Sequence, residues 1–321
     1  MPLILKITQM NDKKIKQLSK QSLLTKVGCV LFILHFPLSL NAQLLWRIDG
    51  NGLAQASYLF GTHHLIPAEF LENVPGVFQA FRATETVIGE MVLYNIEASE
   101  KIMQASRLPV GITMESLLSA DDWAIVDLEL QRTLRMGLRE LALLRPNMIN
   151  TLYTIELFGQ FTDAAGDIKL DSYFQILAIQ ENKRILGLET VEQQLEALFG
   201  SSLQREAEML VKTVQMREEV IAGIKELNRL YKAGEIEELY QFSQNSNSPT
   251  AFTAEEAARL NSDRNQRWAQ ILPDLMRESP SFIAVGALHL GGEQGLINLL
   301  RQQGFRVSPV GEETPRRRSR R

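Results

Sequence analysis

Two matching four-residue segments stand near opposite ends of the 321-residue chain, and each ends in histidine. The first is Gly61-Thr62-His63-His64 and the second is Gly286-Ala287-Leu288-His289; each follows an apolar run. These Gly-x-x-His segments hold three of the four histidines, and the fourth is His35. Imidazoles concentrated in this way are typical of a metal site or of acid/base catalysis.

Two carboxylates occupy equivalent positions, because Glu90 and Glu189 also close short apolar runs. If the four runs are neighbouring strands of one polarity, two imidazoles and two carboxylates converge in one crevice. Two histidines and one carboxylate would then bind a divalent cation, with zinc, manganese and cobalt all compatible. The other carboxylate would be free to act as general base on a water molecule.

Structural roles compete with this interpretation. His64 and His289 could fasten the sheet through hydrogen bonds, and Glu90 and Glu189 could cap helices or form ion pairs. By strand alternation, His63 points away from His64, which favours a structural or supporting role for it.

Two further polar residues are candidates for a substrate-binding or supporting role. Asp171 could cap the helix that follows it, or it could orient a ligand. Arg264 could neutralise a substrate carboxylate or oxyanion, or it could belong to a surface ion pair. The chain contains no His-Glu-x-x-His, Gly-x-Ser-x-Gly or phosphate-loop motif.

The elements that must position these residues form two similar units. A hairpin over 44–61, turning at 49–52, delivers the first motif, and a helix over 67–82 and a strand over 86–91 follow. A strand over 282–285 delivers the second motif, and a helix over 293–303 and a strand over 305–310 follow. The two units read as βαβ-like halves that face each other.

The residues between the halves are predicted to be mostly helical, with one strand at 184–189. The fold class is therefore α/β, with a mixed central sheet built from two βαβ-like halves and a large helical insertion between them. The predicted helices are 121–136, 138–158, 169–182, 191–232, 236–243 and 254–277.

The N-terminal 42 residues resemble a secretory signal peptide, with five lysines over residues 13–26 directly before the apolar stretch Val27–Leu40. We expect a signal peptide at 1–42, one domain at 43–310, a basic solvated tail at 311–321, and periplasmic or secreted localisation. Membrane contact would occur only through an uncleaved signal segment. Residues 1–42 carry six Lys and one Asp, which leaves a net charge of −9 on the rest and argues against nucleic-acid binding.

Four ordered segments together resemble the TraB/GumN family, whose superfamily includes the Tiki membrane metalloproteases. They are Tyr58–His64, Val87–Glu90, Leu186–Gln194 and Val285–Leu290 followed by Gly295-Leu296. The resemblance covers about Leu44 to Val310 and implies an erythromycin esterase/ChaN-like fold.

The resemblance also implies metal-dependent peptide hydrolysis, with His64, His289 and Glu90 as the metal ligands. Glu189 matches a later Leu-Glu-Thr element, and Arg264-Asn265 matches a polar pair. His63 stands where the family usually has a small or aliphatic residue, so either His63 or His64 could face the site.

The sequence therefore predicts an exported metal-dependent hydrolase, with peptidase as the favoured class and a peptide or protein as substrate. Glu189 would activate or position water. The alternative is a non-catalytic extracytoplasmic protein that binds haem, metal or peptide in the same crevice.

Overall fold

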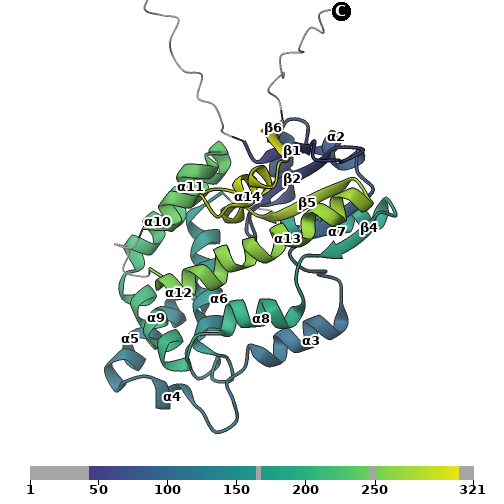
Figure 1. Ribbon diagram of the computed structural model, residues 1–321. Helices are drawn as coiled ribbons and strands as arrows, with labels where there is room; N and C mark the ends of the chain where they lie inside the picture. Colours follow the sequence, from purple (N-terminus) through teal and green to yellow (C-terminus); the bar gives the residue numbers. More distant parts are fainter. Residues whose placement is uncertain (1–42, 164–167, 246–250, 311–321) are drawn as a thin grey trace, which may run out of the picture. The chain divides into compact units, whose positions relative to one another are not determined.

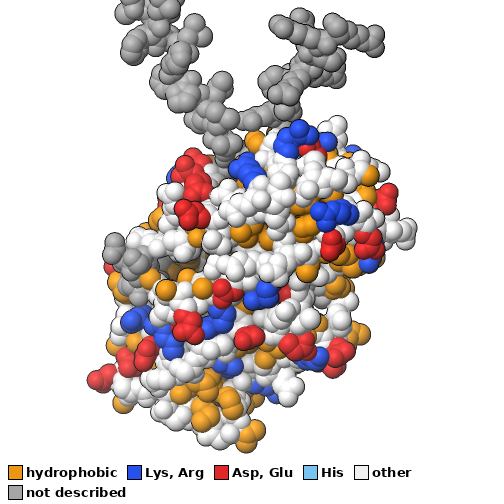
Figure 2. All heavy atoms as spheres, in the orientation of Figure 1, with side chains coloured by type: hydrophobic (Ala, Val, Ile, Leu, Met, Phe, Trp, Pro, Cys, Tyr) orange, Lys and Arg blue, Asp and Glu red, His pale blue; other side chains and the backbone are white. Residues whose placement is uncertain are grey.

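The computed structural model describes residues 43–163, 168–245 and 251–310. The predicted signal peptide and the predicted basic tail lie outside the described residues. Within the described residues, every helix is too short or too polar to cross a membrane. On the face shown in Figure 2, Lys and Arg side chains lie among Asp and Glu side chains.

A six-stranded sheet forms the centre of the described part and has the order β4-β3-β5-β2-β1-β6. Only β1 runs against the others, because it pairs antiparallel with both β2 and β6 while β2, β5, β3 and β4 pair in parallel. The mixed sheet is confirmed. The strands are β1 (Leu45–Asp49), β2 (Ser57–Thr62), β3 (Thr86–Gly89), β4 (Arg184–Gly187), β5 (Ser281–Gly286) and β6 (Arg306–Pro309).

The two predicted halves interleave within this sheet. The strand β5 of the second unit lies between β2 and β3 of the first, with Phe282 opposite both Tyr58 and Val87. The closing strand β6 returns to the far edge beside β1. Residues more than 190 positions apart in the chain, such as Gly89 and Ala284, are therefore direct neighbours.

Helices cover both faces of the sheet (Figure 1). On one face, α2 (Val77–Arg82) and α7 (Leu170–Gln180) bring Phe81 and Phe174 against Phe60 and Phe282. On the other face lie α13 (Asp263–Glu278) and α14 (Leu296–Gln302), which contact each other. Most of these side chains are fully buried, so burial of apolar area stabilises the sheet that carries the motifs.

The helical insertion has a second apolar core of its own. Its helices α5, α6, α9 and α10 pack against one another, and an ion pair between Arg145 and the buried Glu206 crosses this region. The helices here are α3 (Ile96–Ala105), α4 (Met114–Leu117), α5 (Ala120–Leu134), α6 (Pro146–Phe161), α8 (Val191–Phe199), α9 (Leu203–Gln215), α10 (Arg217–Ala233) and α11 (Ile236–Ser243).

Several predicted helix bounds were wrong, and local capping explains each difference. The predicted helix 67–82 is divided into a 3₁₀ helix, η1 (Ala68–Asn73), and α2, because Gly76 has a left-handed backbone with φ of 80°. The predicted helix 138–158 begins only at Pro146, which occupies its first turn. The predicted helix 191–232 is three helices, and Ser202 caps the second.

The long helix before β5 changes its winding partway along. It begins as α12 (Ala254–Ala257), widens into a π-helix at Ala258–Ser262, and continues as α13. Its start is held by Glu256, whose carboxylate accepts two hydrogen bonds from Arg205 of α9, at 2.9 and 3.0 Å. Short π-helical turns often occur at functional sites. This one lies directly before Arg264.

We expect Glu256→Gln to lower the free energy of unfolding by about 1–2 kcal/mol at pH 7, because the ion pair with Arg205 is lost. Hydrogen bonds from Arg205 lower the pKa of Glu256 to about 2 from an ordinary 4.5. The stabilisation is therefore fully present above about pH 4.5 and disappears as the pH falls toward 2. Urea unfolding at several pH values measures the difference. The exposed neighbour Glu255→Gln is the control, and an equal loss in both variants would contradict the prediction.

Candidate functional site

Four parallel strands end at the same edge of the sheet, and each is followed by a predicted site residue. His64 follows β2, Glu90 follows β3, Glu189 follows β4, and His289 follows β5 at the end of a short 3₁₀ helix, η3 (Ala287–His289). Three of the four, with Arg264, line a cleft of about 930 Å³ that includes its solvent-filled mouth. The predicted convergence therefore occurs, with Glu189 behind the cleft wall.

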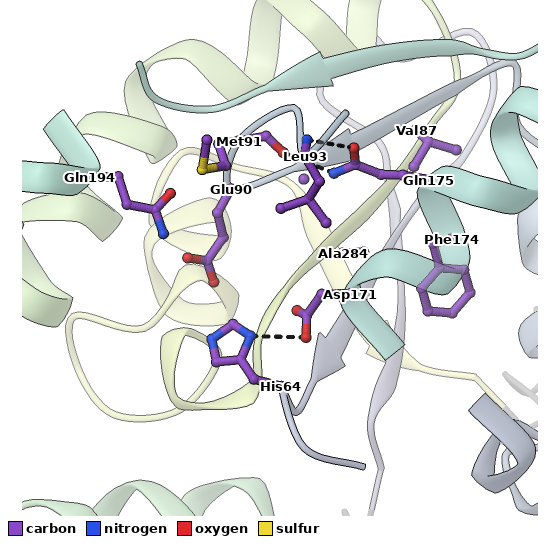
Figure 3. Close-up of a pocket in the computed structure, with 11 residues that line it drawn as sticks. His64, Val87, Glu90, Met91, Leu93, Asp171, Phe174, Gln175, Gln194 and Ala284 are labelled. Atoms are coloured by element: carbon purple, nitrogen blue, oxygen red, sulfur yellow. Dashed lines mark hydrogen bonds and ion pairs between the residues drawn. The ribbon is translucent and has the colours of Figure 1, made fainter. Parts of the chain in front are cut away.

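Glu90 is the carboxylate that lines the cleft. It also lines a second pocket, shared with His64 and Asp171 and drawn in Figure 3. Its Oε1 accepts a hydrogen bond from the backbone N–H of Gly286 at 2.8 Å, and its Oε2 accepts one from Arg264 at 2.5 Å. Burial alone would favour the neutral acid, but His289, Arg264 and His64 outweigh it and lower the pKa of Glu90 to about 2. Glu90 is therefore ionised at neutral pH.

Glu189 lies deeper, with 1% of its side chain exposed, and its two oxygens both bind Arg264. Nε of Arg264 donates to Oε2 at 3.0 Å and Nη2 donates to Oε1 at 2.6 Å. This two-point geometry is the strongest pairing available to a carboxylate and a guanidinium. The surface ion pair considered for Arg264 is thus wrong, because the residue is buried and central.

His289 is buried, and its hydrogen bonds define its tautomer. Asn265 uses its side-chain N–H groups on Asn261 and on the carbonyl of Gln294, so its Oδ1 is the atom that faces His289. Nδ1 of His289 must therefore donate to Oδ1, at 2.7 Å. Burial lowers the pKa of His289 to about 4, so the ring is neutral and Nε2 keeps its lone pair.

The lone pair of His289 Nε2 points toward the other charged groups of the site. Nη1 of Arg264 lies 3.1 Å from this nitrogen, and Oε1 of Glu90 lies 3.9 Å from it. Arg264 and His289 both contact Trp268: the guanidinium carbon lies 4.6 Å from the indole centroid, and the imidazole centroid lies 4.5 Å from it with the rings tilted by 50°. The indole thus packs against both side chains.

His64 lies at the mouth of the cleft, with 69% of its side chain exposed. Its Nδ1 is 2.9 Å from Oδ2 of Asp171, and the other carboxylate oxygen of Asp171 accepts a hydrogen bond from Thr62. The carboxylate of Asp171 raises the pKa of His64. In Figure 3 the second ring nitrogen lies on the side away from Asp171, and Glu90 lies across the same pocket. Of the two roles considered for Asp171, the orienting contact is present.

His63 points into the insertion instead. Its ring lies 5.2 Å from Phe158 and 5.1 Å from Tyr231, and its Nδ1 accepts the backbone N–H of Leu65. Burial lowers the pKa of His63 to about 4. Both histidines line the cleft, but His64 also shares a second pocket with Glu90, whereas the ring of His63 packs on Phe158 and Tyr231.

Three supporting side chains were missed by reasoning from residue types alone. Thr62 holds Asp171, Asn261 holds Asn265 and donates to the carbonyl of Leu288, and Trp268 carries Arg264. For two of the three, Asn261 and Trp268, the spacing from a candidate residue could have indicated the contact. Asn261 with Asn265, and Arg264 with Trp268, are four residues apart and share a helix face.

A divalent cation is compatible with the donor types of this site. Two imidazoles each have one nitrogen fixed, by Asp171 and by Asn265, and such support is usual for metal-binding histidines. Glu90 adds a charged oxygen. Across the described ranges, however, no group of three or more His, Cys, Asp and Glu residues stands in a metal-holding arrangement. The guanidinium of Arg264 lies among the donors.

Comparison with known proteins finds distant relatives that are named Tiki metalloproteases. The chain is 24% identical to Metalloprotease TIKI2 of Danio rerio in an alignment of 320 residues, and the alignment covers 85% of this chain and 62% of that protein. It is 24% identical to Metalloprotease TIKI1 of Xenopus tropicalis over 326 residues, covering 84% and 62%. The chain thus spans less than two thirds of these relatives. No solved structure matches it significantly.

A family model gives the more complete match. The model described as the TraB/PrgY/gumN family matches residues 44–309, which include both Gly-x-x-His segments and all four strand ends of the site. The resemblance noted from the motifs is therefore confirmed, and the chain belongs to the TraB/PrgY/gumN family.

Proposed function

We propose that this protein is an exported metal-dependent peptidase whose cation is held by His64, His289 and Glu90. The observation that carries the proposal is that these three residues line one cleft, and each imidazole has one nitrogen fixed by a neighbour. The relatives at 23–24% identity are named metalloproteases, which supports the same class of enzyme.

The bound cation would polarise the peptide carbonyl and lower the pKa of water to about 7. The protein's own residues would do the rest. Neutral His289 offers Nε2, Asp171 orients His64, and the N–H of Gly286 fixes the Glu90 carboxylate. Glu90 would contribute its ionised carboxylate as a ligand of the cation.

The structure supports a different role for Glu189 from the predicted activation of water. Its side chain is 1% exposed, both of its oxygens accept hydrogen bonds from Arg264, and it does not line the cleft. A general base needs to be within hydrogen-bonding reach of water or substrate. We assign Glu189 to positioning Arg264, and Glu90 to contact with the reacting groups.

The walls of the cleft favour a peptide with apolar side chains beside the scissile bond. Beyond the polar group around Glu90, the cleft is lined mainly by aliphatic side chains, of which Ile155 is 43% exposed at the mouth. Such surface stabilises an apolar substrate side chain by removing it from water. The aliphatic residues are Leu65, Ile155, Leu227, Leu239, Ala287 and Leu288.

Export is proposed from the N-terminal segment, in which lysines precede an apolar stretch. The protein would then act in a periplasm or outside the cell. Its metal would be drawn from that compartment, where zinc, manganese and cobalt remain the candidates for a site of imidazole and carboxylate donors.

Replacing His64 or His289 by alanine is expected to lower metal affinity by more than about 100-fold, because loss of a supporting residue alone costs about 10–100-fold. Peptide hydrolysis should fall with it. Metal analysis of the purified full-length protein, followed by digestion of an unbiased peptide mixture, measures both. His63→Phe is the matched control, since it removes an imidazole but keeps the aromatic packing, and it should retain metal.

Two outcomes would contradict the proposal. Wild-type protein that binds no divalent metal would rule out the metal centre. Wild-type protein that binds metal through His64 and His289 but cleaves no peptide would support the non-catalytic binding protein instead.

A charge at the cleft mouth should change substrate preference. We expect Ile155→Arg to lower kcat/KM for peptides with leucine or phenylalanine beside the scissile bond by about tenfold or more. Acidic side chains should be accepted better, because the new guanidinium attracts them. Leu128→Arg is the control, since Leu128 is 71% exposed and lies on α5 away from the cleft. Equal kinetics for Ile155→Arg and wild type would show that substrate does not use this wall.

A further inference from the structure

The guanidinium of Arg264 occupies the centre of the candidate site. Only 6% of the residue is exposed, and its nitrogens contact both carboxylates and the buried imidazole. Nη1 also donates to the carbonyl of Leu260 at 3.2 Å. A single side chain thus contacts four groups, namely two carboxylates, one imidazole and one backbone carbonyl.

The atoms that Arg264 contacts are the atoms that a metal ion would need. At His289 the free lone pair is on Nε2, because Nδ1 donates to Asn265, and Nη1 of Arg264 lies 3.1 Å from it. At Glu90, Oε2 accepts from Nη2 of Arg264. Nε2 of His289 has one lone pair, which cannot serve the guanidinium and a divalent cation at once. The like charges of the two cations also repel each other in a site with little water. At His289, contact with Arg264 and binding of a metal ion are therefore mutually exclusive.

We propose that Arg264 is an internal cation that competes with the metal ion, and that it withdraws from Glu90 and His289 when the metal binds. This inference rests on the proposed metal-dependent function. In the metal-free protein, Arg264 orients Glu90 and His289 through its contacts with Oε2 and Nε2. When the metal ion binds, it takes the place of Arg264 as the positive partner of Glu90.

Glu189 defines how Arg264 can move. Because Glu189 is almost completely buried, leaving it without a positive partner would be strongly destabilising. Arg264 therefore keeps Glu189 as its partner. Because the guanidinium is a rigid plane, Nη1 leaves His289 only when the whole group shifts along that carboxylate. The π-helical turn at Ala258–Ser262 ends two residues before Arg264, and such turns often occur at functional sites.

The competition predicts opposite effects of one substitution on two measured quantities. In the full-length protein, Arg264→Gln should bind zinc or manganese about tenfold more tightly than wild type, since a competing cation is gone. Its melting temperature without metal should be lower, and added metal should raise it by more than in wild type. Titration calorimetry measures the affinity, and thermal unfolding with and without metal measures the second effect.

Two further variants keep the test decisive. Arg229→Gln is the charge-matched control, because this exposed residue pairs only with nearby glutamates, and it should leave metal affinity unchanged. If Arg264→Gln does not fold, Arg264→Lys replaces it, since an ammonium cannot make the fork contact with Glu189 and also reach His289. Its metal affinity should also exceed that of wild type.

The outcomes separate this inference from the proposed function. If Arg264→Gln or Arg264→Lys binds metal as wild type does, or more weakly, the competition is refuted while the metal centre stands. If neither wild type nor any Arg264 variant binds a divalent ion, the proposed function itself fails.

Discussion

The site depends on the parallel pairing of β5 between β2 and β3. This pairing places the last strand to carry a motif between the two strands that end in His64 and Glu90. Because all of them run in one direction, their carboxyl ends open at one edge of the sheet. Ser281–Gly286 is buried almost throughout, so slippage by one residue would turn Phe282 and Ile283 to opposite faces and separate the histidines.

Pairing strands in this way also concentrates negative charge at one place. Glu90 and Glu189 would repel each other and lose hydration unless a positive group lay between them. Arg264 is that positive group, and two other side chains of its helix contact the same site. Trp268 lies one turn later and supports both the guanidinium and His289, while Asn265 faces the ring from the next position.

Patterns in the sequence were sufficient for the local parts of this arrangement. Short apolar runs located six strands, and a common polarity of four of them was the condition under which His64, Glu90, Glu189 and His289 were expected to converge. The interleaved strand order could not be predicted, because strand pairing depends on the packing of Phe60, Phe81, Phe174 and Phe282 rather than on local pattern.

The position of Arg264 was equally inaccessible, since its helix has many charges and burial is a tertiary property. Charge pattern alone favours a solvated ion pair.

The two histidines of the site are not equivalent, and the difference has a chemical consequence. His289 is buried, neutral and fixed by Asn265, so it offers one permanent lone pair at the inner end of the cleft. His64 is exposed, and Asp171 favours its protonated form. A cation that enters from solvent would meet His64 and Glu90 first, and it would reach His289 only where Arg264 now lies. In the proposed metal site, His289 and Arg264 would therefore control the same final step of binding.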